Sequence, residues 1–104
     1  MVKAEFYKTN GTFSGFRISG HTGYAPRGRD IVCAAVSSAV QLTVNMLYEF
    51  KIGIKTSSDG GAVECIVKNA GDDISPRIIK QLMHHFELVL EEFPKTIKIT
   101  ISEV

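Results

Sequence analysis

The stretch VKAEFYKTNGTFSGFRIS, residues 2–19, indicates how the chain begins to fold. Apolar and polar residues alternate over residues 2–7, and this period of two predicts a strand. Asn10-Gly11 follows, and this pair is the strongest short signal for a hairpin turn. A second strand is predicted over residues 12–19. The opening stretch therefore predicts an antiparallel hairpin.

Residues 31–50 change the pattern, because they contain neither glycine nor proline. Apolar positions and one threonine recur at spacings of three and four, which predicts the buried face of a helix: Val32, Val36, Ala39, Thr43, Leu47 and Phe50. Other apolar residues extend well beyond that face. Two interpretations stay open, a central helix wrapped by the protein's own sheet and a helix that also forms a homodimer interface.

A second hairpin and a second helix are predicted downstream. IGIK at 52–55 and AVECIV at 62–67 flank SSDGG, which is typical of two strands joined by a turn. Ser75-Pro76 opens a helix with proline at a position where its missing N–H costs nothing. Pro94 ends this helix. Its apolar residues fall at helical spacing and form one stripe: Ile78, Ile79, Leu82, Phe86, Val89, Leu90 and Phe93.

The last predicted strand carries Ile97, Ile99 and Ile101 on its inward face. Polar residues between them leave one face of the sheet in water, which favours an arrangement of two layers. The predicted fold is α+β, in the order ββαββαβ, with a largely antiparallel sheet packed against two helices. The length of 104 residues predicts a single domain over residues 1–104.

Composition narrows the class of protein. The formal net charge is +1, from 12 Lys and Arg against 11 Asp and Glu. Nucleic-acid binding is not expected, because the chain lacks the basic excess that is typical of such proteins. The first residues show no signal peptide, and no stretch approaches the roughly 20 apolar residues of a membrane span. We therefore expect a cytoplasmic protein that does not bind membranes. Its two cysteines are expected to be separate thiols.

Cys33 is the first candidate for chemistry. With Asp30 as the N-cap, Cys33 would occupy the third helical position, where the helix dipole favours the thiolate and lowers the cysteine pKa. Free N–H groups there could also donate to an oxyanion beside the sulfur. Alternatively, a cysteine beside Val32 and Ala34 is a small core residue.

His21 strengthens the first interpretation of Cys33. It precedes Cys33 by twelve residues, and the glycine-rich stretch GHTGYAPRGRD, residues 20–30, joins the two. A neutral imidazole returned to the helix start could activate the thiol. Asp30 would then either cap the helix or orient His21, and the cap fits with fewer assumptions. Ser37, one turn after Cys33, could hold a water or substrate group, or bond its own backbone.

The remaining cysteine and the remaining histidines are not expected to take part in catalysis. Cys65 alternates with apolar residues and is expected to be a buried structural thiol. His84 is expected in solvent and His85 at the border of the apolar stripe. No Cys/His cluster has the spacing of a zinc site, so neither a metal nor a cofactor is expected.

An anion-binding loop is the main rival interpretation. Gly20, Gly23 and Gly28, with Arg27 and Arg29, precede a helix and could cradle a phosphate. The spacing matches neither the Walker sequence nor the dinucleotide fingerprint. A catalytically idle interaction domain is a further alternative.

The segment GHTGYAPRGRDIVCAAVSS, residues 20–38, closely resembles the signature of the bacterial ribosomal-processing cysteine protease family, Prp. That pattern is a Gly-His pair followed by Gly-x-Asp-x-Val-Cys-Ala-Ala-Val-Ser. It is matched at Gly20, His21, Gly28, Asp30, Val32, Cys33, Ala34, Ala35, Val36 and Ser37. The length and element order also look like that family.

The resemblance implies a catalytic dyad of His21 and Cys33, a homodimer, and a loop over residues 22–29, with Gly23, Arg27 and Gly28, that gates the substrate. It implies as substrate a precursor of large-subunit ribosomal protein twenty-seven, from which a short N-terminal extension is removed. In the expected mechanism the helix-terminal amides stabilise the oxyanion. The alternative kept beside it is a non-catalytic, ribosome-associated binding module with an anion-binding loop.

Overall fold

The computed structural model describes residues 1–20, 27–69 and 71–104, with the backbone alone for residues 27–30. The elements, in chain order, are β1 Val2–Thr9, β2 Thr12–Ser19, α1 Arg27–Glu49, β3 Ile54–Asp59, β4 Ala62–Val67, α2 Ser75–Glu92 and β5 Ile97–Glu103. The predicted α+β class and the order ββαββαβ are confirmed.

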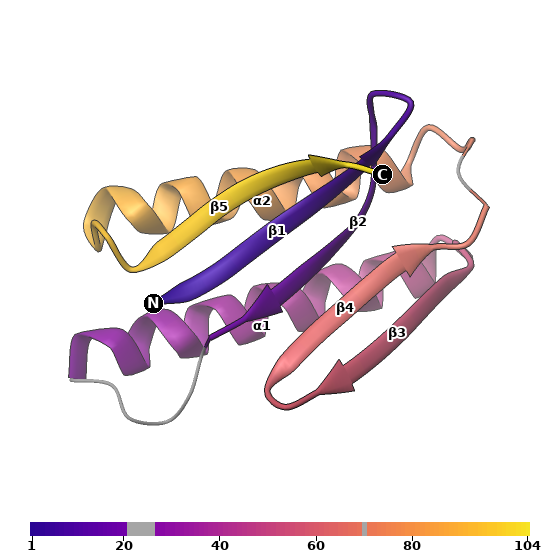
Figure 1. The fold of residues 1–104 in the computed structure, drawn as a ribbon. Coiled ribbons are helices and arrows are strands. Elements are labelled where there is room, and N and C mark those ends of the chain that lie inside the picture. Colours follow the sequence, from indigo (N-terminus) through magenta and orange to yellow (C-terminus); the bar gives the residue numbers. More distant parts are fainter. Residues whose placement is uncertain (21–26, 70) are drawn as a thin grey trace.

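The strands form one mixed sheet in the order β3-β4-β2-β1-β5. Three neighbouring pairs are antiparallel, and β5 runs parallel to β1. Both helices cover the same face of the sheet, with α2 behind β5 and β1 and packed most closely against β2, and α1 behind β2 and β4 (Figure 1). The structure therefore has the two predicted layers, with a largely antiparallel sheet.

Both hairpin turns rest on residues that tolerate a positive φ. Asn10-Gly11 has φ values of 54° and 76°, and Gly60-Gly61 has 56° and 86°. Two positive φ values match the right-handed twist of the flanking strands. The second turn needs only its two glycines, so β3 continues through Ser57 and Ser58, which the sequence prediction placed in the turn.

A bulge in the first hairpin brings two phenylalanines to the helix side. Ser14 is the extra residue, since Tyr7 pairs with Gly15 and Lys8 pairs with Phe13. Phe13 and Phe16 are both buried despite their odd spacing. A regular strand would place Phe13 and Phe16 on opposite faces. The bulge therefore enlarges the aromatic core beyond the prediction.

The core lies between the sheet and the two helices. Phe6 lies at its centre, with its ring centroid 6.3 Å from that of Phe16 and 6.0 Å from that of Phe86. The stripe predicted for α2 is confirmed at its fully buried positions, Ile78, Ile79, Leu82 and Phe86. Two predictions are wrong: Phe50 lies beyond the end of α1 and is 50% exposed, and Ile101 is 51% exposed.

The first helix is more apolar than the core requires. By length and composition Ile31–Glu49 could cross a membrane, with a mean hydropathy of 1.6, contrary to the expectation that no stretch approaches a span. Core helices of soluble proteins share this property, and the face with Val32, Val36 and Leu47 is buried. Large apolar side chains also remain exposed along the helix, namely Ile31, Leu42, Met46 and Tyr48. The sheet of this chain therefore does not wrap the helix completely.

Candidate active site

The position of Cys33 differs from the sequence prediction. α1 begins at Arg27, so Asp30 lies inside the helix and Cys33 lies in its second turn. Asp30 is therefore not the N-cap. The free N–H groups of the first turn belong to residues before Cys33, so the prediction that helix-terminal amides surround its sulfur is wrong. Gly28 was placed in the loop before the helix, but a glycine inside a helix costs only about 1 kcal/mol relative to alanine, and the helix includes it.

The Cys33 side chain lies at the boundary between the core and the surface. Its thiol is free and half-buried, and it packs against the hydrophobic core. Residues three, four and seven positions later share its face of the helix. Of these, Val36 and Val40 are buried, whereas Ser37 is exposed. Cys33 can therefore be reached along a surface that continues past Ser37.

The backbone at Gly20 explains why a glycine precedes His21. Gly20 follows the last residue of β2 with a φ of 85°, and a Cβ placed there would lie 2.5 Å from the carbonyl oxygen of Met1. Both the conformation and the space therefore require glycine. His21 and Gly23 lie outside the described residues. The predicted contact between His21 and Cys33 accordingly remains a prediction.

Part of the predicted gating loop belongs to the first helix. Arg27 and Gly28, which were assigned to it, form the first turn of α1. The same correction applies to the anion-binding alternative, because Gly28 and Arg29 belong to the helix and not to a loop before it. The remaining residues of the predicted loop, 22–26, lie outside the described residues.

The second cysteine has none of the features of a nucleophile. Cys65 is 0% exposed, and burial raises the pKa of its thiol to about 11. On β4 it pairs with Phe16 on one side and Thr56 on the other. The prediction of a buried structural thiol is confirmed. Of the two cysteines, Cys33 is the one that reaches the surface.

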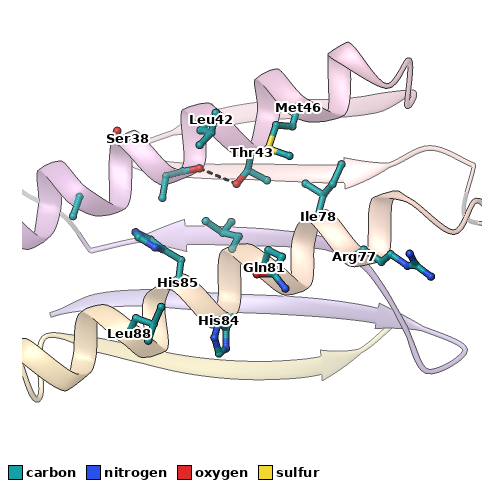
Figure 2. A pocket seen from close by; sticks show the side chains of 13 residues that line it. Ser38, Leu42, Thr43, Met46, Arg77, Ile78, Gln81, His84, His85 and Leu88 are labelled. Carbon is teal, nitrogen blue, oxygen red and sulfur yellow. Dashed lines mark hydrogen bonds between the residues drawn. The ribbon is translucent and has the colours of Figure 1, made fainter.

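Two grooves flank α1. The first, which we call the helix groove, lies between α1 and α2, has a volume of about 600 Å³, and includes Leu42, Met46, His85 and Leu88. Figure 2 shows side chains of both helices facing it. The second, the hairpin groove, lies between α1 and the β3–β4 hairpin and has a volume of about 460 Å³. Sequence reasoning missed both grooves, because each joins segments far apart in the chain.

Neither His84 nor His85 forms a catalytic cluster among the described residues. His84 is exposed, and its Nδ1 lies 3.7 Å from the carboxylate of Glu87, as expected for a solvated helix face. His85 is exposed and lines the helix groove. Across residues 1–20, 27–69 and 71–104, no group of three His, Cys, Asp or Glu side chains is placed to hold a metal ion.

Comparison with known proteins gives a family and a fold. The model of the family described as cysteine protease Prp matches residues 1–98. No match is found among the curated proteins. Among solved structures, SMU.848 from Streptococcus mutans superposes with a TM-score of 0.82 at 22% identity, covering 100% of this chain and 99% of that one.

Two further structures come from Staphylococcus aureus. The essential ribosomal processing protease Prp, in complex with a substrate peptide, gives a TM-score of 0.88 at 18% identity. The same protease with a covalently linked product peptide gives 0.84 at 20% identity. Each comparison covers 97% of this chain and 99% of the other. At these identities the likeness shows a shared fold.

Proposed function

Since this chain belongs to the cysteine protease Prp family, and is therefore a cysteine protease, we propose that Cys33 is its nucleophile and His21 its general base. The observation that carries the proposal is the contrast between the two thiols. Cys33 is half-buried on a helix face that opens to the surface, whereas Cys65 is fully buried and has a raised pKa. Membership of a protease family also argues against the non-catalytic binding module.

The proposed reaction is peptide hydrolysis through a thioester. His21 takes the proton from the Cys33 thiol, and Sγ attacks the carbonyl carbon of the scissile bond. The C–N bond breaks as the imidazolium returns its proton to the leaving amine. Water then attacks the thioester, with His21 as base, which yields a carboxylate and the free thiol. The chemistry calls for no metal or cofactor.

The supporting residues have roles consistent with their positions. Gly20 lets the chain turn at the end of β2 and so sets where His21 begins. Asp30 would orient His21, which is the other role that the sequence offers for its carboxylate. Ser37 lies on the Cys33 face and would contact the substrate or a water. The segment from Gly20 to Arg27, which contains Gly23, would open to admit the substrate.

The proposed substrate is a ribosomal protein precursor in the cytoplasm. The structural relatives from Staphylococcus aureus are ribosomal processing proteases, and one holds a substrate peptide. The sequence signature further implies the N-terminal extension of large-subunit ribosomal protein twenty-seven. We propose that the single domain over residues 1–104 removes this extension.

We also propose that the protein acts as a homodimer. The exposed face of α1 carries Ile31, Leu42, Met46 and Tyr48, and large apolar groups of this kind are typical of a face covered by a partner. Leu42→Asp should convert the dimer to monomer in light scattering coupled to size-exclusion chromatography. A wild-type protein that is monomeric at micromolar concentration would contradict this part of the proposal.

Cleavage of a peptide that spans the extension junction tests the assigned residues. Cys33→Ala and His21→Ala should each abolish cleavage, whereas Cys65→Ala should retain it, because Cys65 is remote from the surface. Circular dichroism would verify that each variant is folded. Undiminished cleavage by Cys33→Ala would overturn the proposed mechanism.

A further inference from the structure

The hairpin groove has an apolar floor and a neutral polar rim. Its floor is formed by Ile18, Val36, Val40, Val44 and Val63, and its rim by Ser37, Gln41, Thr56, Ser57 and Ser58. The rim residues are exposed, so the groove is open to solvent. Its volume of about 460 Å³ falls within the range of roughly 300–1,000 Å³ for ligand sites.

The groove follows the helix face that carries Cys33. Val36, Ser37, Val40 and Val44 come three, four, seven and eleven residues after Cys33, and these spacings place them on one face of an α-helix. The helix groove uses the opposite side of α1, through Ser38, Leu42 and Met46 among others. Of the two grooves, the hairpin groove is therefore the one aligned with the candidate nucleophile.

The length of the groove fits an extended peptide. From Cys33 to Val44 the helix rises about 16 Å, at about 1.5 Å per residue. An extended chain covers that distance with roughly five residues. A substrate held at Cys33 could therefore place several consecutive side chains along the groove.

The chemistry of the lining selects one kind of occupant. Its floor is aliphatic, and none of its ten lining residues is charged. A charged side chain seated on this aliphatic floor would give up part of its hydration without gaining an opposite charge. β3 is also the outer strand of the sheet, so its free edge can hydrogen-bond the main chain of an extended peptide.

We propose that the hairpin groove binds the substrate chain on one side of the scissile bond and selects apolar, uncharged side chains at those positions. The proposal rests on the proposed role of Cys33 as nucleophile. It assigns to Thr56 and Ser58 a part in specificity, because their strand positions face the helices. Thr56 pairs with the buried Cys65, whereas its neighbour Lys55 pairs with Ile66 and lies on the opposite face.

A matched pair of variants on β3 tests the proposal. Thr56→Phe adds bulk at the groove, and Lys55→Phe adds the same bulk on the other face of the strand. Both positions are exposed, so both variants should fold. For a peptide that wild type cleaves, Thr56→Phe should lower kcat/KM about tenfold or more, and Lys55→Phe should leave it within about twofold. Equal losses in both variants, or none in Thr56→Phe, would overturn the proposal.

A second variant tests selectivity rather than access. Peptides with lysine substituted at each position near the scissile bond should include some that wild type cleaves poorly. Thr56→Asp places a carboxylate at the groove. It should therefore raise the kcat/KM for a lysine peptide, relative to that for the matching leucine peptide, by about fivefold or more. An unchanged ratio at every position would refute the groove assignment.

Alkylation separates failure of the inference from failure of the proposed function. Iodoacetamide is too small to need the groove, so it should label Cys33 in Thr56→Phe as fast as in wild type. If the Cys33→Ala variant still cleaves peptide, the proposed nucleophile is wrong. If Cys33→Ala is inactive but the β3 variants match wild type with every peptide, the nucleophile stands and the groove assignment fails.

Discussion

Gly20, which precedes His21, needs glycine for two reasons, its positive φ and a close backbone contact. Gly11 and Gly15 each show one of these reasons alone, so comparing the three separates them. Gly11 has a φ of 76° and open space, with no atom within 4 Å of an added Cβ. Gly15 has no positive φ, but its added Cβ would lie 2.6 Å from the carbonyl oxygen of Cys65. Gly20 combines both demands, with a φ of 85° and an oxygen at 2.5 Å.

The cost of alanine at each position follows from these values. A left-handed φ costs an alanine about 1–2 kcal/mol, and overpacking against a backbone atom costs about 1–3 kcal/mol. Gly11→Ala should therefore lower the free energy of unfolding by about 1–2 kcal/mol. Gly15→Ala should lower it by about 1–3 kcal/mol. Gly20→Ala should lose the sum, about 2–5 kcal/mol, from a domain whose stability is about 5–15 kcal/mol.

Urea denaturation followed by circular dichroism measures these losses, and peptide cleavage measures their consequence for His21. Gly20→Ala should be the least stable of the three variants. At low temperature, where it remains folded, its kcat/KM should still fall about tenfold or more, because a displaced base no longer reaches the thiol. Gly11→Ala should retain activity. If Gly20→Ala were as stable and active as Gly11→Ala, the close approach at Met1 would not constrain the chain.

Three further predictions concern single groups. Iodoacetamide at neutral pH should label Cys33 well before Cys65, whose burial raises its pKa to about 11, and equal rates would contradict the assignment. Burial pushes the pKa of Asp72 upward, but hydrogen bonds from the first residues of α2 outweigh it and lower the pKa. Asp72→Ala should therefore lower the free energy of unfolding by about 1 kcal/mol at pH 7. The difference from wild type should shrink as the pH falls below the unfolded pKa of Asp72, because acid then protonates the wild-type carboxylate. An unchanged difference at pH 2 would refute this. Burial, and then the hydrogen bond and charge of Glu64, raise the pKa of Tyr7 to about 12. The protonated Tyr7 therefore stabilises the fold fully below pH 10, and this stabilisation is lost toward pH 12. Glu64→Gln should lower the pKa of one tyrosine in an ultraviolet titration, and an unchanged pKa would contradict the assignment.

Local patterns in the sequence predicted most of the fold. Alternation marks β1 and β2, and the stripe of α2 was identified because helical spacing depends only on nearby residues. The parallel pairing of β5 with β1 was not predicted, because the partner of a returning strand is decided by packing. Ile101 is 51% exposed although it alternates with Ile97 and Ile99, and the spacing of residues along the strand does not show this.

The candidate site was predicted less completely than the fold. The signature proposed His21 and Cys33, but residues 27–29 were placed in the loop and the helix start was therefore placed too late. The hairpin groove was missed because its two walls come from residues 36–44 and 56–63, which only the folded sheet brings together. The small polar run at Ser57-Ser58, within a strand, was the one local signal that could have suggested an open edge.

The measurement that tests the central claim most directly is covalent trapping of the nucleophile. A peptide chloromethyl ketone, with the sequence preceding the cleaved bond, would be incubated with the protein and the products digested with trypsin. Cys33 falls in the fragment 30–51 and Cys65 in the fragment 56–68, so mass spectrometry distinguishes them. We expect one adduct per chain, on the fragment with Cys33, formed in step with the loss of cleavage activity. Loss of activity with Cys33 unmodified would contradict the account.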